Sequence, residues 1–286
     1  MEHLITLDTD QVLLYRFRPE LLPSNLEDAL APNVGQGLVI DTETTGRGTG
    51  DRVVEIAVLP FFFDRHTGKL LAATKGYNSL NDPGIPISPE ASEVNGITDD
   101  MVRGKHADWE RVAGMLRAAD VVIAHNAKFD RPRVHAEFRY AGIDAPDVLW
   151  ACSLDQINWK KLPEKPPAAA LGSLCAWYGF FFSAHRALGD CQALLHLLDV
   201  SRQLGALYTE AQKPSFVIRA GGKTYQFKDR VKEKGYQWND SAKVWQRVVK
   251  TEQDAADERQ WLRDNIYGRD GDAGETIVVS PKERFL

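Results

Sequence analysis

Apolar residues early in the chain form short runs that are typical of strands. Alternating or continuous apolar runs predict strands at 38–41, at 52–63 and near 69–77, with a turn at 64–68 between the last two. Neighbouring strands joined by such short connections pair antiparallel. The pattern therefore predicts a three-stranded antiparallel meander.

Helical spacings follow this meander. Apolar residues three and four positions apart predict helices through 109–116 and over 187–204, with a buried strand at 120–126 and a helix closed by Gly142 between them. Short helices are predicted near 89–95, 98–102 and 171–178, whereas three prolines at 163, 166 and 167 predict a loop over 158–170. A meander followed by alternating strands and helices predicts an α/β domain with a mixed sheet.

The last quarter of the chain has a different pattern. It predicts a hairpin around Gly221 and Gly222, a short helix ending at Gly235, a strand at 243–249 and a helix near 252–266. Residues 214–250 contain nine Lys or Arg and three Asp or Glu, interleaved with aromatic residues, which suggests a nucleic-acid surface. The alternative, that Trp238 and Trp245 form the core of a small module, stays open.

These patterns divide the chain into five parts. They are an N-terminal extension of unassigned role (1–36), an α/β domain (37–205), a linker (206–213), a small basic α+β module (214–268) and a flexible tail (269–286).

Composition narrows the class of protein. The chain has 286 residues, of which 43% are hydrophobic and 26% are charged, as in globular proteins that are not membrane-embedded. Its apolar runs are too short to span a bilayer, and its three cysteines form no ligand-like cluster, so a cytoplasmic protein is expected. A net charge of −5 argues against a protein that coats nucleic acid, although a local basic site remains possible.

The segment "LVIDTETTGRG" (38–48) contains the first candidate chemistry. Because side chains alternate along a strand, Asp41 and Glu43 are predicted to share one face. Two adjacent carboxylates favour a hard divalent cation such as Mg²⁺ or Mn²⁺. The alternative is a solvated strand end before a glycine-rich turn.

Further acids lie at the ends of other predicted elements. Asp130 follows the buried strand "VVIAHN", and His185 precedes Asp190 in "AHRALGDCQALL". Five residues place two side chains on different faces of a helix, so His185 is predicted in the loop ahead of the helix and Asp190 in its first turns. With Asp41 and Glu43, these residues form one candidate constellation.

Three motifs, "DTETTG", "HNAKFD" and "HRALGD", resemble the exonuclease motifs of the DnaQ-like DEDDh superfamily of 3′-to-5′ exonucleases. The resemblance covers about residues 37–204 and includes the intervening "SPEASEVNGITDDMV". It implies a ribonuclease-H-like fold with a mixed five-stranded sheet flanked by helices. The form "HRALGDC" is most similar to the exonuclease X branch, which acts on DNA.

The resemblance also implies roles for these residues. Asp41, Glu43, Asp130 and Asp190 would hold two divalent cations, Mg²⁺ or Mn²⁺, and His185 would be the general base. An imidazole can take a proton from the attacking water near neutral pH, for which a lysine is too basic. The expected partner is nucleic acid with a free 3′ end, either single-stranded DNA or a duplex end, and the products would be nucleoside monophosphates.

Substrate contacts are implied by the same resemblance. They comprise Thr44, Thr45 and Gly46 for the terminal sugar, Ile97 for the terminal base, Asn126 and Phe129 nearby, and Arg47 where relatives carry a wedging leucine. An arginine there could stack on a base or bind a phosphate, or be a solvated loop charge.

Other functions remain open at this point. An exoribonuclease of the same fold would differ mainly in accommodating the ribose 2′-hydroxyl. A polymerase-associated proofreading or nucleic-acid-binding protein could use the fold as a scaffold, which loss of a metal ligand would favour; all four are present.

Overall fold

The computed structural model describes residues 5–8, 11–30, 32–268 and 274–285. The chain divides into two compact units, of which the first runs to Ala211 and also includes Phe285, and the second is Gln212–Arg284. Within the described residues, no helix combines the length and apolar character needed to cross a membrane.

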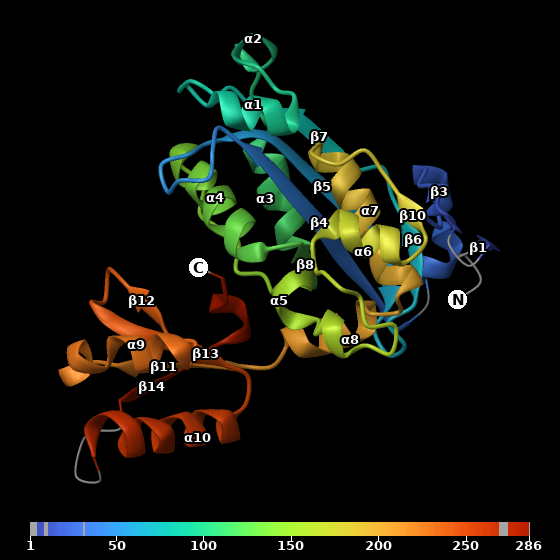
Figure 1. Ribbon diagram of the computed structural model, residues 1–286. Helices are drawn as coiled ribbons and strands as arrows, with labels where there is room; N and C mark the ends of the chain where they lie inside the picture. Colours follow the sequence, from blue (N-terminus) through green and yellow to red (C-terminus); the bar gives the residue numbers. More distant parts are fainter. Residues whose placement is uncertain (1–4, 9–10, 31, 269–273, 286) are drawn as a thin grey trace. The chain divides into compact units, whose positions relative to one another are not determined.

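The first unit is built on a mixed sheet (Figure 1). Its strands are β4 (Val34–Thr44), β5 (Val53–Asp64), β6 (Leu70–Ala73), β7 (Tyr77–Leu80), β8 (Val121–Ala124) and β9 (Trp150–Cys152), in the order β6-β5-β4-β8-β9 with β7 also on β5. Strand β5 pairs antiparallel with β4, β6 and β7. Strand β8 pairs parallel with β4 and β9. The predicted mixed sheet is therefore confirmed, although it has six strands where five were expected.

One edge of this sheet differs from the prediction. The single strand expected near 69–77 is two short strands, β6 and β7, and both pair with β5. The interruption lies opposite Pro60, whose carbonyl accepts from the Thr74 amide at 2.9 Å but which has no N–H to return. A continuous ladder is therefore impossible at that point.

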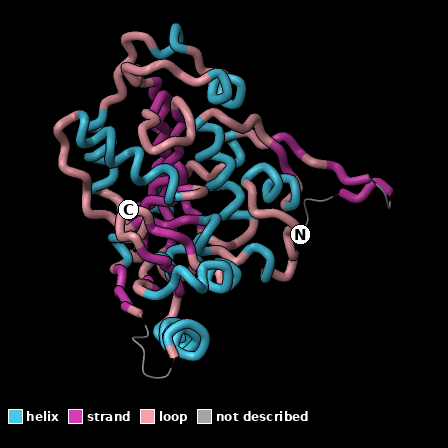
Figure 2. The backbone as a smooth tube through the Cα atoms, turned by 60° about the vertical axis from the view of Figure 1, so that its left-hand side comes forward, coloured by secondary structure: helices cyan, strands magenta, loops and turns pink. Residues whose placement is uncertain are grey.

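Helices cover both faces of the sheet, as Figure 1 shows and as the tube in Figure 2 confirms. One face packs on α3 (Trp109–Arg117) and α4 (Ala127–Tyr140), and the other on α6 (Leu171–Trp177), α7 (Ala187–Val200) and α8 (Leu204–Ala211). Leu38 and Ile40 of β4 lie in the first of these cores, and Val39 lies in the second. This alternation decides which helix each side chain at the end of β4 meets.

Two expectations for the end of this unit are wrong. The helix predicted over 187–204 ends at Val200, because Arg202 has a left-handed φ of 56° that an α-helix cannot continue. The expected linker at 206–213 is mostly helix α8, whose Leu204, Leu207 and Ala211 are buried in the core.

Short helices connect the main elements. They are α1 (Pro89–Asn95), α2 (Asp99–Val102), α5 (Ser153–Gln156) and the single 3₁₀ turn η3 (Trp159–Lys161) inside the predicted loop at 158–170. Helix α1 starts at Ser88, whose hydroxyl accepts from the Ala91 amide at 3.1 Å, and ends at Gly96 with a φ of 70°. The helices predicted near 89–95 and 98–102 are confirmed.

The segment before β4 packs on the first unit rather than forming a separate extension. After the hairpin of β1 (Ile5–Asp8) and β2 (Gln11–Leu13), strand β3 (Tyr15–Arg16) pairs parallel with β10 (Phe180–Phe181). The hydroxyl of Tyr15 lies 2.6 Å from Nε2 of His196 on α7. Phe17 and Leu22 are buried in the core, and the 3₁₀ turns η1 (Pro19–Leu21) and η2 (Leu26–Leu30) lead to β4. Burial of these apolar side chains explains why the boundary at residue 36 does not hold.

The second unit has a four-stranded antiparallel sheet in the order β12-β13-β11-β14. Its elements are β11 (Ser215–Ala220), η4 (Lys223–Phe227), α9 (Lys228–Glu233), β12 (Gln237–Asn239), β13 (Val244–Val249), α10 (Glu252–Leu262), a π-helical turn η5 (Arg263–Tyr267), β14 (Glu275–Val279) and η6 (Pro281–Glu283). The core contains Ile218, Val231 and Leu262. The helix ending at Gly235, the strand at 243–249 and the helix from 252 are confirmed.

Two expectations for this unit are corrected. The hairpin around Gly221 and Gly222 does not form, because 223–227 is a 3₁₀ turn and β11 pairs with β13 and β14 instead. Part of the expected flexible tail is strand β14, which completes the sheet through pairs such as Val217 with Ile277; residues 269–273 lie outside the described part of the chain. Long-range strand pairs of this kind have no local sequence signal.

Candidate active site

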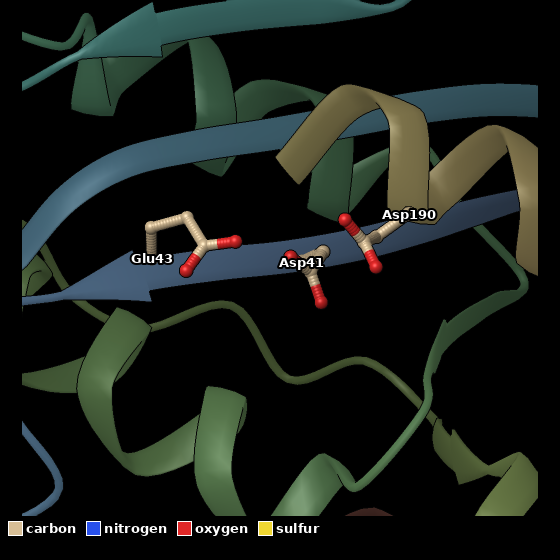
Figure 3. A group of neighbouring side chains, drawn as sticks. All are labelled: Asp41, Glu43 and Asp190. Carbon is tan, nitrogen blue, oxygen red and sulfur yellow. The ribbon is translucent and has the colours of Figure 1, made fainter. Parts of the chain in front are cut away.

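Three carboxylates gather where β4 leaves the sheet (Figure 3). Asp41 and Glu43 have the parity of Val39 and therefore lie on the face of β4 that meets α7. Asp190, in the first turn of α7, completes the group: one oxygen from each of the three side chains lies within 4.8 Å of the others. The shared face predicted for Asp41 and Glu43 is confirmed.

Asp130 approaches from the opposite helix layer. Strand β8 pairs with β4 only as far as Val39, so the amide of Thr42 needs another acceptor. Oδ1 of Asp130 on α4 provides it, accepting from the Thr42 amide at 3.1 Å and from its hydroxyl at 2.8 Å. Asp130 is thereby fixed beside the strand, although it is not part of the group of three oxygens.

His185 lies two residues before α7, as the spacing predicts. Its backbone is left-handed, with a φ of 67°, and the residue is exposed. The amide of Arg186 donates to Oδ2 of Asp190 at 3.0 Å. This bond ties the loop that carries His185 to the carboxylate at the start of the helix.

Burial makes this group electrostatically costly. Burial, and next the charge of Asp130, raises the pKa of Asp41 well above its ordinary value. Burial likewise raises the pKa of Glu43 to about 8, that of Asp130 to about 7 and that of Asp190 to about 6. In Asp190, a backbone hydrogen bond from Arg186 and the nearby His185 partly oppose this increase.

Glu55 is a fifth acid that sequence reasoning missed. It lies opposite Glu43 in the β4–β5 ladder, yet its side chain is only 1% exposed and is neutralised. Arg186 donates to it through Nε at 3.0 Å and Nη2 at 2.8 Å, and the amide of Ala187 donates at 3.2 Å. The sequence indicates a possible ion pair here only through Arg186, which lies next to His185. The fold identifies Glu55 as the partner of Arg186.

This ion pair forms a second anchor for the His185 loop. Arg186→Ala is expected to lower the free energy of unfolding by about 1–3 kcal/mol, less than a fully buried pair because half of the Arg186 side chain is exposed. It should also lower kcat about 10- to 100-fold with little change in KM, because the loop loses its position rather than its substrate contacts. Steady-state kinetics and thermal unfolding measure the two effects.

Arg52 offers a matched control. It makes an equivalent pair with the buried Glu137, through Nε at 2.8 Å and Nη2 at 2.9 Å, while the Val53 amide donates to the same carboxylate. Arg52→Ala should cost similar stability but leave kcat intact below its melting temperature. Equal loss of kcat in both variants, or none in Arg186→Ala, would contradict a positioning role.

The loop after Glu43 is held by its own hydrogen bonds. The hydroxyl of Thr44 donates to the carbonyl of Gly46 at 2.6 Å, and that of Thr45 donates to Asp51 at 2.7 Å. A Cβ at position 46 would lie 2.7 Å from an Asp51 oxygen, so a larger residue there would displace the Asp51 carboxylate. Arg47 at the tip is exposed, and its carbonyl accepts from Arg133 at 3.2 Å.

The other expected substrate residues are more scattered. Ile97 is fully buried in a small apolar cluster, whereas Asn126 begins α4 with a left-handed φ of 98°. The ring of Phe129 lies under the Arg133 guanidinium, 3.5 Å from its centroid. Sequence reasoning also missed Asn95, whose side-chain hydrogen bond to Glu43 partly opposes the rise in that acid's pKa.

A mixed sheet of this order between two helix layers, with acids from β4, α4 and α7 at one end, defines the class of DnaQ-like DEDDh exonucleases. The exonuclease family model (RNase T) matches residues 38–198, more than half of the chain. The chain therefore belongs to this exonuclease family, and it is a 3′-to-5′ exonuclease.

The chain is also similar to individual known proteins. The chain is 30% identical over 195 residues to the DNA polymerase III subunit epsilon of Treponema pallidum, covering 61% of this chain and 82% of that protein. Among solved structures, exonuclease X in complex with 5′-overhanging duplex DNA is 26% identical, covers 60% of this chain and 99% of its own, and has a TM-score of 0.43. Escherichia coli exonuclease I in complex with a dA16 oligonucleotide is 17% identical, covers 81% and 71%, and has a TM-score of 0.52, which supports the fold.

Proposed function

We propose that this protein removes nucleoside monophosphates from the 3′ end of DNA, with two divalent cations and a histidine general base. The observation that carries the proposal is the meeting of oxygens from Asp41, Glu43 and Asp190 within 4.8 Å of one another, with His185 in the loop just ahead of Asp190.

The donor set fits a hard divalent cation. Its atoms are carboxylate oxygens, and among the described residues no lysine or arginine pairs with Asp41, Glu43 or Asp190, whereas nearby Glu55 has its own arginine. Mg²⁺ or Mn²⁺ held by these three acids and Asp130 would activate water and stabilise charge on the phosphate and the leaving oxygen. The raised pKa values of these acids support the same idea, since a cation would relieve the repulsion.

The chain's own residues supply the remaining steps. His185 takes the proton from the attacking water, and its exposed position allows the imidazole to reach a phosphate and to pass the proton on to solvent. The turn at Thr44, Thr45 and Gly46 receives the terminal sugar, because its backbone is fixed by the bonds to Asp51 and places the 3′ end beside Glu43. Arg47 at the exposed tip contacts the terminal base or its phosphate.

DNA is the proposed substrate because of the relative with the highest identity reported above, a subunit of a DNA polymerase. The geometry of the acids is equally suited to a ribonucleotide, since the difference lies in room for the 2′-hydroxyl. The choice between them rests on a direct measurement.

The test is degradation of matched single-stranded DNA, duplex DNA and RNA, each labelled at the 5′ or the 3′ end. We expect a 3′ label to be released as a mononucleotide at once and a 5′ label to appear in a shortening ladder, with Mg²⁺ or Mn²⁺ but not with a chelator. Faster loss of RNA than of DNA would replace the proposed substrate. Activity in the chelator would refute the metal requirement.

A further inference from the structure

The second unit carries a surface that the catalytic chemistry does not use. Helix α9 and strands β12 and β13 bring together Lys228, Lys232, Trp245 and Trp238, which we call the basic-aromatic strip. Lys228 and Lys232 are both exposed and lie four residues apart, on one face of α9. The strip thus combines two cations with two indole rings.

Contacts connect three members of the strip. Nζ of Lys232 lies 5.7 Å from the ring centroid of Trp245. Trp245 and Trp238 are directly opposite in the β12–β13 ladder, with ring centroids 5.6 Å apart and an interplanar angle of 65°. Nε1 of Trp238 donates to Oδ1 of Asp240 at 3.4 Å, which helps to orient the indole.

The two tryptophans have different roles. Trp245 is partly buried and packs against the core of the unit, so it serves the fold. Trp238 is 48% exposed and does not belong to that core, and its ring is therefore available to a ligand. A large exposed aromatic ring held in place by a packed neighbour loses little conformational entropy when a second ring stacks on it.

Lys232 differs from several other cations of the second unit in the kind of group it contacts. Arg247 and Lys234 pair with the buried Glu258, Lys243 pairs with Asp240, and Arg219 pairs with Glu275. Among the described residues, no carboxylate pairs with Lys232, which contacts an indole instead. The positive charge of Lys232 therefore lies over Trp245, the ring that contacts the exposed Trp238.

We propose that the basic-aromatic strip binds single-stranded nucleic acid, with a base stacked on Trp238 and the backbone phosphates beside Lys232 and Lys228. Single strands are favoured over duplexes because only an unpaired base offers a free face to the ring, and stacking tolerates any sequence. This inference rests on the proposed function, since the strand bound here is the polymer whose 3′ end is degraded. A second attachment on the same chain raises the local concentration of the 3′ end and favours long substrates.

The experiment uses the full chain with the inactivating change Asp41→Asn, so that the strand is not degraded during the measurement. Binding of oligo-dT of about 30 nucleotides and of about 4 nucleotides is measured by fluorescence anisotropy across a salt series. Adding Trp238→Ala and Lys232→Gln together should weaken binding of the long strand about 10-fold or more and leave the short strand unchanged. The salt dependence should fall by about one unit of slope, for one lost phosphate contact.

Two variants serve as matched controls. Trp238→Phe keeps a ring for stacking and should retain most of the affinity, which separates stacking from a folding defect. Lys243→Gln removes the same charge from the same unit, but its ammonium already lies 2.8 Å from Asp240, so binding should hardly change. An equal loss of affinity for the long strand in Lys243→Gln and Lys232→Gln would show a general charge effect and would overturn the proposal.

Other outcomes are equally decisive. Unchanged binding of long DNA by the double variant would reject nucleic acid as the ligand and leave Trp238 as part of a protein contact. The proposed function is judged separately, because hydrolysis of the short oligonucleotide by the protein with an intact Asp41 does not depend on the strip. If the protein binds long strands through Trp238 but hydrolyses no substrate, the proposed binding strip is supported and the proposed function is refuted.

Discussion

Asp41→Asn should abolish hydrolysis, with a loss of about 10³-fold or more in kcat. The change keeps the shape of the side chain but removes one of the carboxylate charges that would hold the divalent cations, and each 1.36 kcal/mol of lost stabilisation costs tenfold. The measurement is single-turnover release of a 3′-terminal nucleotide under saturating Mg²⁺ or Mn²⁺. Near-normal rates in this variant would mean that the group around Asp41 is not the metal site.

The same substitution should stabilise the protein in a chelator, and increasingly so as the pH rises. Because folding raises the pKa of Asp41, its ionisation opposes folding. The stability that these buried acids contribute is greatest below the ordinary carboxyl pKa of about 4 and is lost towards the folded values, about 6 for Asp190 and about 8 for Glu43. Asparagine does not ionise. The melting temperature of Asp41→Asn should therefore exceed that of the wild type more clearly at about pH 8 than at about pH 5.

Asp100→Asn is the control for both measurements. Asp100 is exposed on α2 and pairs with Arg103, the residue just after that helix, at 2.7 Å. Neither the hydrolysis rate nor the pH dependence of stability should change.

If divalent cations raise the melting temperature of Asp41→Asn at about pH 8 as much as that of the wild type, the cations bind elsewhere.

His185→Ala should lower kcat by about 10²- to 10⁴-fold, the span expected when a general base is lost. Binding of divalent cations should persist, because all four acids remain. The test combines kcat for release of the 3′ nucleotide with the rise in melting temperature on adding Mn²⁺. The rate should fall and the stabilisation should stay.

Added imidazole gives this prediction a sharper form. His185 is exposed, so a small base can enter the space that its ring leaves and restore part of the rate. His66→Ala, in an exposed turn after β5, should show neither the loss nor the rescue. Normal activity in His185→Ala would assign the proton transfer to another group.

Local patterns predicted the sheet strands that form the site. In these strands, the buried side chains are also the ones that form apolar runs in the sequence. Asp41 and Glu43 could be placed on one face because successive side chains of a strand point to opposite faces, and His185 could be placed ahead of α7 because of its spacing from Asp190. The break of the sheet edge at Pro60 could have been predicted, since a proline within a run is a known interruption. The end of α7 at Val200 could not be predicted, because the left-handed backbone of Arg202 has no sequence signal.

The features that sequence reasoning missed depend on contacts between distant segments. Arg186 and Glu55 are 131 residues apart, so only the paired strands and the docked helix reveal their bond. Strand β14 lies beyond the predicted basic module (214–268), and its partner β11 is about 60 positions earlier. The role of Trp238 likewise needed the structure, because a tryptophan in a small module is as often core as surface.

The N-terminal strand has a practical consequence for handling the protein. A fragment cut at the limits of family similarity, 38–198, would lack β3 and the buried Phe17, and it would end inside α7. Phe17 packs against Phe180 and His196, with 6.0 Å and 5.0 Å between ring centroids. Without Phe17, these two side chains would form an apolar patch exposed to solvent. Such a fragment should aggregate on expression. A fragment that starts before Tyr15 and continues through α8 should not, because Phe17 still covers Phe180 and His196.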